Sequence, residues 1–241
     1  CGDVADVERR LTRDPASAVA TGGPMNWPAL AYVVYGRLDA SNAVTIARLL
    51  LAAGADTNFS HNDGWDNAFT LVTGAIGLGE GAKPSHPQAT ELVELLVAAG
   101  ASPFDTQALY NISIVGQDVY WYDLLWRHCE AQGVTDRWRD AVSYRIGGNR
   151  PLNPLDYLLG NAVGQNHLER AEWLLARGAN ADTPHAYTGQ PVHALAQLSG
   201  FVDMAALLER HGATPVALSG AQAFRAACLR GDEANARALL A

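Results

Sequence analysis

Seven histidines and three cysteines are the most obvious candidates for catalysis or metal binding in this chain. His167 and Glu169 are two positions apart, whereas two ligands on one helix face lie three or four positions apart. His128 and Cys129 are adjacent, so on a helix their side chains point in different directions. The sequence also lacks the His-Glu-x-x-His, Cys-x-x-Cys and Gly-x-Ser-x-Gly patterns. We therefore expect no catalysis, no bound metal and no cofactor.

Lys83 lies in a glycine-rich segment, residues 77–88, whose composition is loosely that of a phosphate-binding loop. Such a loop needs a Gly-Lys-Ser/Thr sequence that runs from a strand directly into a helix, with backbone N–H groups around the phosphates. Here Ala82 precedes the lysine, Pro84 follows it, and no strand is predicted before the segment. We expect a solvated connecting loop rather than a nucleotide site.

The polar residues around Asp63 form the remaining candidate site. The Asp63-Gly64 pair predicts a tight turn between two extended stretches. His61, Asp63 and Asp66 would lie near one another and near Trp65, where they could orient a cation or a polar ligand. The other interpretation is that the tip of a hairpin is simply polar.

A recurring phrase, two leucines followed by glycine and alanine, predicts the elements that position these residues. It ends a predicted helix within 50–58, 95–102, 174–180 and 207–214, and Gly133 ends a more divergent copy. Glycine takes the left-handed conformation that terminates a helix without a Cβ clash. The terminal glycines, at positions 54, 100, 133, 178 and 212, are separated by 46, 33, 45 and 34 positions. Two spacings match a repeat of about 33 residues, and two match it with about a dozen residues added.

Several predicted first helices begin with proline, in Trp27-Pro28-Ala29-Leu30, Asn153-Pro154-Leu155-Asp156 and Gln190-Pro191-Val192-His193. Proline suits the first helical position, where its missing N–H costs nothing. With the helix-end phrase, these segments make nearly the whole chain resemble the ankyrin-repeat family. Residues 166–169 are similar to the family's Gly-His-x-Glu at the start of a second helix. His193 keeps the histidine that in the family ties a helix start to the backbone.

The resemblance implies an all-α fold, an ankyrin-like helical repeat solenoid with short β-hairpins or turns between its units. It would form a single domain over residues 1–241, with about six to seven units. The units would run roughly over 1–23, 24–58, 59–104, 105–135, 136–182, 183–216 and 217–241. We expect the first and last units to be partial, and residues 77–88 and 134–150 to be insertions.

Aromatic residues concentrate in the least regular unit, as Tyr110, Tyr120, Trp121, Tyr122 and Trp126. Tyr122 and Trp126 are four positions apart and share one face of a helix. They could fill core space beneath an insertion. Alternatively they could form a ligand platform, because Tyr and Trp combine a large contact area with a polar group. The second interpretation favours an alternative function, a small-molecule binder or enzyme with its pocket in residues 110–157 and the insertions.

Composition restricts the partners. The net charge of −8, the pI near 5.3 and a single lysine argue against a nucleic-acid surface and favour a partner protein with a basic patch. With 49% apolar residues the chain has enough material for a substantial core. It has no run of 18 apolar residues, so we expect no membrane span. Three cysteines without a disulfide-framework spacing predict reduced thiols in a cytoplasmic protein.

In ankyrin proteins the hairpins and first helices line a concave face, which is the usual partner-binding surface. The resemblance therefore implies a protein–protein interaction module. We expect the partner to contact residues at hairpin tips and in the first turns of first helices, namely Asn62, Asp63, Trp65, Asp66, Asp105, Tyr110, His185 and Tyr187. A purely structural spacer within a longer chain is the third possibility.

Overall fold

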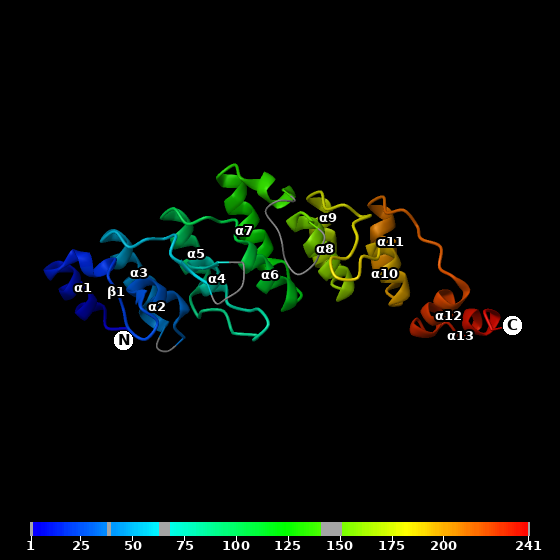
Figure 1. Cartoon of the computed structure of the whole chain (residues 1–241), viewed down its shortest axis with the longest axis horizontal. Coiled ribbons are helices and arrows are strands. Elements are labelled where there is room, and N and C mark those ends of the chain that lie inside the picture. The colour runs from blue at the N-terminus through cyan, green and yellow to red at the C-terminus, as the bar shows by residue number, and fades with distance from the viewer. Residues whose placement is uncertain (1, 38–39, 63–67, 141–150, 241) are drawn as a thin grey trace. The chain divides into compact units, whose positions relative to one another are not determined.

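The computed structural model describes residues 2–37, 40–62, 68–140 and 151–240. Over this part the chain is mostly helical, with thirteen α-helices and four strands of two residues each (Figure 1), which confirms the all-α class. The chain divides into two compact units. Unit 1 comprises Cys1–Val115 and Trp121–Gly133, and unit 2 comprises Gly116–Tyr120 and Val134–Ala241.

Unit 1 is built from packed helix pairs. Its helices are α1 (Val4–Arg13), α2 (Ala29–Tyr35), α3 (Ala43–Ala52), α4 (Leu71–Ile76), α5 (Ala89–Ala98), α6 (Thr106–Ile114) and nearly all of α7 (Tyr120–Ala131), with short 3₁₀ turns η1 (Pro15–Ala18) and η2 (Ala40–Asn42). The first helix of each pair packs on its partner, α2 on α3 and α4 on α5. Successive pairs also stack, α2 against α4 and α3 against α5, and α1 and α6 extend the two rows. Apolar side chains such as Leu30, Val34, Leu71 and Leu92 are completely buried between the pairs.

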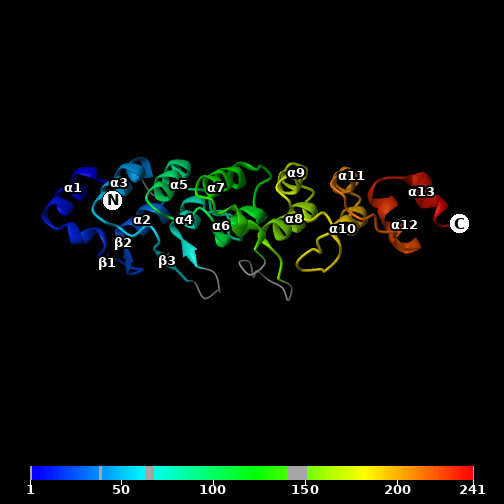
Figure 2. The ribbon, with the colours of Figure 1, turned by 90° about the horizontal axis from the view of Figure 1, so that it is seen from above.

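Two short hairpins precede the first helices of unit 1. Strand β1 (Thr21–Gly22) pairs with β2 (Trp27–Pro28), and β3 (Ser60–His61) pairs with β4 (Phe69–Thr70). Figure 2 shows both hairpins on one side of α2 and α4, with α3 and α5 on the opposite side. The expected tip at Asp63-Gly64 lies outside the described residues.

The pairing of β4 shifts one helix start. The sequence pattern predicts a helix over residues 67–76, but α4 begins at Leu71. Phe69 and Thr70 are extended because they pair with His61 and Ser60. The Thr70 hydroxyl then accepts a hydrogen bond from the Thr73 N–H and caps the helix.

Proline has two different positions at the helix starts. Pro154 occupies the first turn of α8 (Pro154–Gly164), as expected. Pro28 and Pro191 lie one position earlier, as extended residues that precede their helices. Both belong to an antiparallel pairing, Pro28 with Thr21 and Pro191 with Pro184, which explains their extended backbone.

The helix ends repeat the same backbone geometry. Gly54 and Gly100 have positive φ values of 91° and 105°, in the left-handed region that favours glycine. The alanine after each terminal glycine donates to the carbonyl five residues earlier. This bond recurs as Ala55 to Leu50, Ala101 to Leu96, Ala179 to Leu174 and Ala213 to Leu208, at 2.9 to 3.1 Å. The expected glycine-terminated helix end is therefore confirmed at these four places.

Unit 2 repeats the paired arrangement. Its helices are α8, α9 (Leu168–Ala176), α10 (Val192–Leu198), α11 (Val202–Arg210), α12 (Gly220–Leu229) and α13 (Glu233–Ala238), with the 3₁₀ segment η3 (Thr135–Arg139). The pairs are α8 with α9, α10 with α11 and α12 with α13; α10 also packs on α8 and α12, and α9 packs on α11. Segment η3 packs on α8 and buries Trp138 completely, with its ring centroid 6.0 Å from that of Trp173.

The helices of the described segments differ from membrane-spanning helices in length and composition. None of them combines the length and the apolar composition needed to cross a bilayer.

Candidate functional site

Six aromatic rings gather where the hairpins of unit 1 meet the first helices, and we call them the aromatic cluster. They are Trp27, Tyr32, Tyr35, Phe59, His61 and Phe69. His61 stacks between two of them, with centroid distances of 4.6 Å to Trp27 and 5.4 Å to Phe69. Tyr35 lies 5.3 Å from Trp27 and 5.2 Å from His61. All six residues are partly exposed, so the cluster presents an aromatic surface.

Hydrogen bonds of two tyrosines fix this cluster to the backbone. The Tyr32 hydroxyl donates to the Gly22 carbonyl at 2.8 Å and accepts from the Met25 N–H at 2.9 Å. The Tyr35 hydroxyl donates to the Thr70 carbonyl at 2.6 Å. Burial raises the pKa of Tyr35 well above its usual value, so this hydroxyl keeps its proton and its bond at neutral pH. The turn of the first hairpin leaves the Met25 side chain exposed beside the cluster.

Asp105, one of the predicted binding residues, is 5% exposed. It precedes α6, and its carboxylate accepts the Ala108 N–H at 2.9 Å, which is the ordinary N-cap bond. The carboxylate also accepts the hydroxyl of Thr70 and, at 2.9 Å, that of Thr73. Asp105 therefore links α4 to α6, and its acceptor capacity is largely used inside the fold.

Tyr110 anchors the glycine-rich segment 77–88. Its hydroxyl donates to a carboxylate oxygen of Glu80 at 2.6 Å, and the neighbouring Asn111 amide donates to the Gly77 carbonyl at 2.9 Å. On the other side, Arg37 donates to the Pro84 carbonyl at 3.1 Å. The segment is thus a connecting loop held at several points, with exposed residues at its tip.

The predicted residues of the second hairpin are only partly placed. Asn62 directly follows β3 and is exposed, next to His61 of the aromatic cluster. Asp63, Trp65 and Asp66 lie outside the described residues. The cation or polar-ligand interpretation of this tip therefore stays a prediction.

The structure brings His185 and Tyr187 together in unit 2. Their ring centroids are 5.7 Å apart, in the loop before α10. The hydroxyls of Tyr187 and Tyr157 are hydrogen bonded at 2.8 Å, while 54% of Tyr187 remains exposed. Burial lowers the pKa of His185, so its imidazole is neutral at pH 7. This is a second aromatic surface, in the position that a hairpin occupies in unit 1.

Aromatic residues in the middle of the chain serve mainly as core. Tyr122 and Trp126 are buried on α7, which confirms the core interpretation for these two rings. Tyr120 is exposed, and Trp121 is partly exposed. The other chemical candidates are also separated: among the described residues no group of three His, Cys, Asp or Glu side chains could hold a metal ion.

Sequence reasoning overlooked most of the aromatic cluster, although a signal was present. Trp27 and Phe69 each stand two positions before a first helix, in equivalent strands β2 and β4. Tyr32 and Tyr35 lie on the helix that follows Trp27. An aromatic residue recurring at this position marks the hairpin surface more directly than the polar tip does.

Comparison with known proteins adds no further assignment. No protein-family model matches the chain, and no curated protein matches it either. Function must therefore be argued from the geometry and the chemistry of the described residues.

Proposed function

We propose that the chain is a divergent ankyrin-like repeat protein, a solenoid that binds a partner protein through its hairpins and first helices. Support for the repeat assignment comes from the helix pairs within each unit and from the glycine-terminated helix end that recurs at four places. The free thiol of the exposed Cys228 suits a reducing, cytoplasmic setting.

The observation that carries the binding proposal is the aromatic cluster. Partly exposed aromatic rings held in fixed orientations are typical anchors of protein interfaces, because they contribute large contact area with little loss of side-chain freedom. Here β-pairing and the hydroxyl bonds of Tyr32 and Tyr35 hold the rings in place before a partner arrives. The exposed Met25 adds an adaptable apolar contact at the edge of the cluster.

Charge indicates the kind of partner. The net charge of −8 would accelerate encounter with a protein that carries a basic patch. Such a partner would place apolar side chains against the aromatic cluster and basic side chains at the rim. Its affinity would therefore fall as salt screens the rim charges, while the apolar contact would be much less sensitive to salt.

The proposal is tested by retention of proteins from a lysate on the immobilised chain. Met25→Lys places a positive charge beside the cluster, where it repels the basic rim of the partner, and should abolish retention of a specific partner. Val19→Lys is the matched control, because Val19 is 54% exposed and Met25 is 58% exposed. Equal retention by both variants, or retention that does not weaken with added salt, would contradict the proposed surface and its basic partner.

A further inference from the structure

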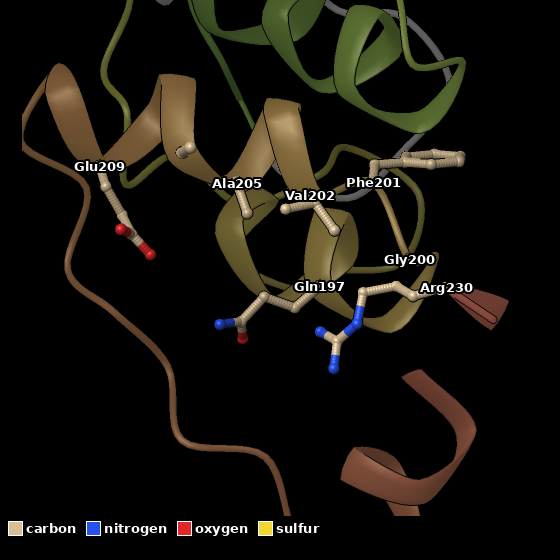
Figure 3. A pocket seen from close by; sticks show the side chains of 8 residues that line it. Gln197, Gly200, Phe201, Val202, Ala205, Glu209 and Arg230 are labelled. Atoms are coloured by element: carbon tan, nitrogen blue, oxygen red, sulfur yellow. The ribbon is translucent and has the colours of Figure 1, made fainter. Parts of the chain in front are cut away.

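A separate pocket lies in unit 2, where α10, α11 and the residue after α12 meet (Figure 3). Its volume is about 220 Å³. This is smaller than the roughly 300–1,000 Å³ of a pocket for a drug-sized ligand, and it suits a ligand of amino-acid size. Neither the partner-binding surface nor the expected insertions include it.

One face of α11 forms the floor of the pocket. Val202, Ala205, Ala206 and Glu209 occupy positions i, i+3, i+4 and i+7, the pattern of residues that share one helix face. From position 202 to position 209 the helix rises by about 10 Å. Val202 is 56% exposed, and the two alanines leave space above the helix. The floor is therefore an apolar strip that ends at a carboxylate.

That carboxylate is held in place by a buried histidine. His193 is 0% exposed, and its Nδ1 accepts the Val216 N–H at 3.3 Å. With Nδ1 as the acceptor, the Nε2 atom carries the proton and donates it to Glu209 Oε1 at 2.9 Å. The second oxygen, Oε2, has no hydrogen-bond partner among the described residues, and the Glu209 side chain is 49% exposed. Glu209 thus presents a fixed negative charge with one oxygen available.

Two further polar groups line the pocket without partners in the described part of the chain. Gln197 Oε1 is buried and accepts no hydrogen bond there. Arg230 is exposed, and no hydrogen bond or ion pair engages its guanidinium within the described segments. A Cβ atom on Gly200 would lie 3.0 Å from Leu229 Cβ and 3.4 Å from Arg230 Cγ, so close packing fixes the stem of Arg230 here. Figure 3 shows Gln197 between Glu209 and Arg230.

We propose that this pocket binds an amino-acid unit that carries both a free α-carboxylate and a cationic side chain, namely arginine or lysine. The carboxylate would pair with the guanidinium of Arg230, which can donate two parallel hydrogen bonds. The cationic group would donate to Glu209 Oε2, the carboxylate oxygen that His193 leaves available. The three or four methylenes between the two ends would lie on the strip of Val202, Ala205 and Ala206.

The opposite charges of Glu209 and Arg230 argue against ligands that carry only one charge. A lone cation at Glu209 would share the pocket with the positive charge of Arg230, and a lone anion at Arg230 would share it with Glu209. A ligand with both charges, one at each end, pairs with both groups. Free arginine or lysine and a peptide with either residue at its C-terminus share this chemistry.

The test is a calorimetric titration of the whole chain with a matched set of ligands. L-Arginine and L-lysine should bind. Agmatine, which lacks the carboxylate, and L-norvaline, which lacks the cationic end, should each bind about tenfold more weakly or worse, because each loses a charge-assisted interaction. The tripeptide Gly-Gly-Arg with a free or an amidated C-terminus then distinguishes the two sources: tighter binding of the free-acid peptide than of arginine identifies a peptide C-terminus.

Variants connect the binding to the pocket. Arg230→Gln and Glu209→Gln should each weaken arginine binding about tenfold or more, and Glu209→Gln keeps an oxygen that can accept from His193. Arg225→Gln on α12 is the control, since Arg225 is exposed and does not line the pocket. The proposal is overturned if none of the ligands binds, if agmatine binds as tightly as arginine, or if Arg225→Gln has the same effect as Arg230→Gln. Loss of the partner-binding function would leave these results unaffected.

Discussion

Replacing Asp105 provides a quantitative check on how unit 1 is held together. Asp105→Ala removes the N-cap bond of α6, which is worth about 1 kcal/mol. It also removes the acceptor for two hydroxyls, of which Thr73 is 2% exposed. A buried donor left without a partner costs about 1–3 kcal/mol. We therefore expect a loss of about 2–4 kcal/mol in the free energy of unfolding of unit 1.

Asp3→Ala is the matched control. Asp3 also caps a helix, accepting the Asp6 N–H at 3.0 Å, but it is exposed and has no buried hydroxyl partner among the residues that the structure describes. Its replacement should cost only about 1 kcal/mol. The measurement is urea unfolding followed by circular dichroism, with amide hydrogen exchange of α4 and α6 to localise the effect. If Asp105→Ala costs no more than Asp3→Ala, the argument that Asp105 links α4 to α6 is refuted.

Two further predictions concern the repeated helix end and a buried histidine. Gly54→Ala should destabilise unit 1 by about 1 kcal/mol, and only because of its φ of +91°, since nothing lies within 4 Å of the added Cβ. Gly22→Ala is the control, because it has equal space and no positive φ, and it should cost less when the two variants are compared by thermal unfolding. Burial, and to a lesser extent the charge of Arg37, lowers the pKa of His86, so the folded state resists protonation of this imidazole. The contribution of His86 to stability is therefore full above the unfolded-state pKa near 6.5 and declines as the pH falls below it. His86→Asn, which keeps an acceptor for the Gln88 N–H, should reduce the fall in the free energy of unfolding between about pH 7 and 5, as measured by urea unfolding. If the free energy of unfolding falls as steeply in the variant, the assignment to His86 is refuted.

The local features of the fold could be predicted from the sequence because they depend on short spacings. Leu50 and Gly54 predict the end of α3, and the same spacing predicts the ends of α5, α9 and α11. The start of α4 was predicted too early, because the pairing of Phe69 with His61 across the hairpin competes with helix formation.

The candidate sites depend on contacts between distant positions, and these were harder to predict. The sequence identifies Asp105 as a polar residue near a helix start. Only the approach of Thr70, 35 positions away, shows that its carboxylate is occupied inside the fold. The structural role expected for His193 agrees with its complete burial, but its partner Glu209 is 16 positions away on the next helix. The pocket beside Glu209 could therefore not have been found from motifs.

The central claim, that the aromatic cluster is a partner-binding surface, is tested most directly by site-specific photo-cross-linking. A photoreactive phenylalanine analogue placed at Met25 should form a cross-link to one basic protein from the lysate, and excess unlabelled chain should suppress the product. The same analogue at Val19, which is exposed to a similar degree, should give no such product. Identical products from both positions, or a retained partner that never cross-links at position 25, would contradict the account.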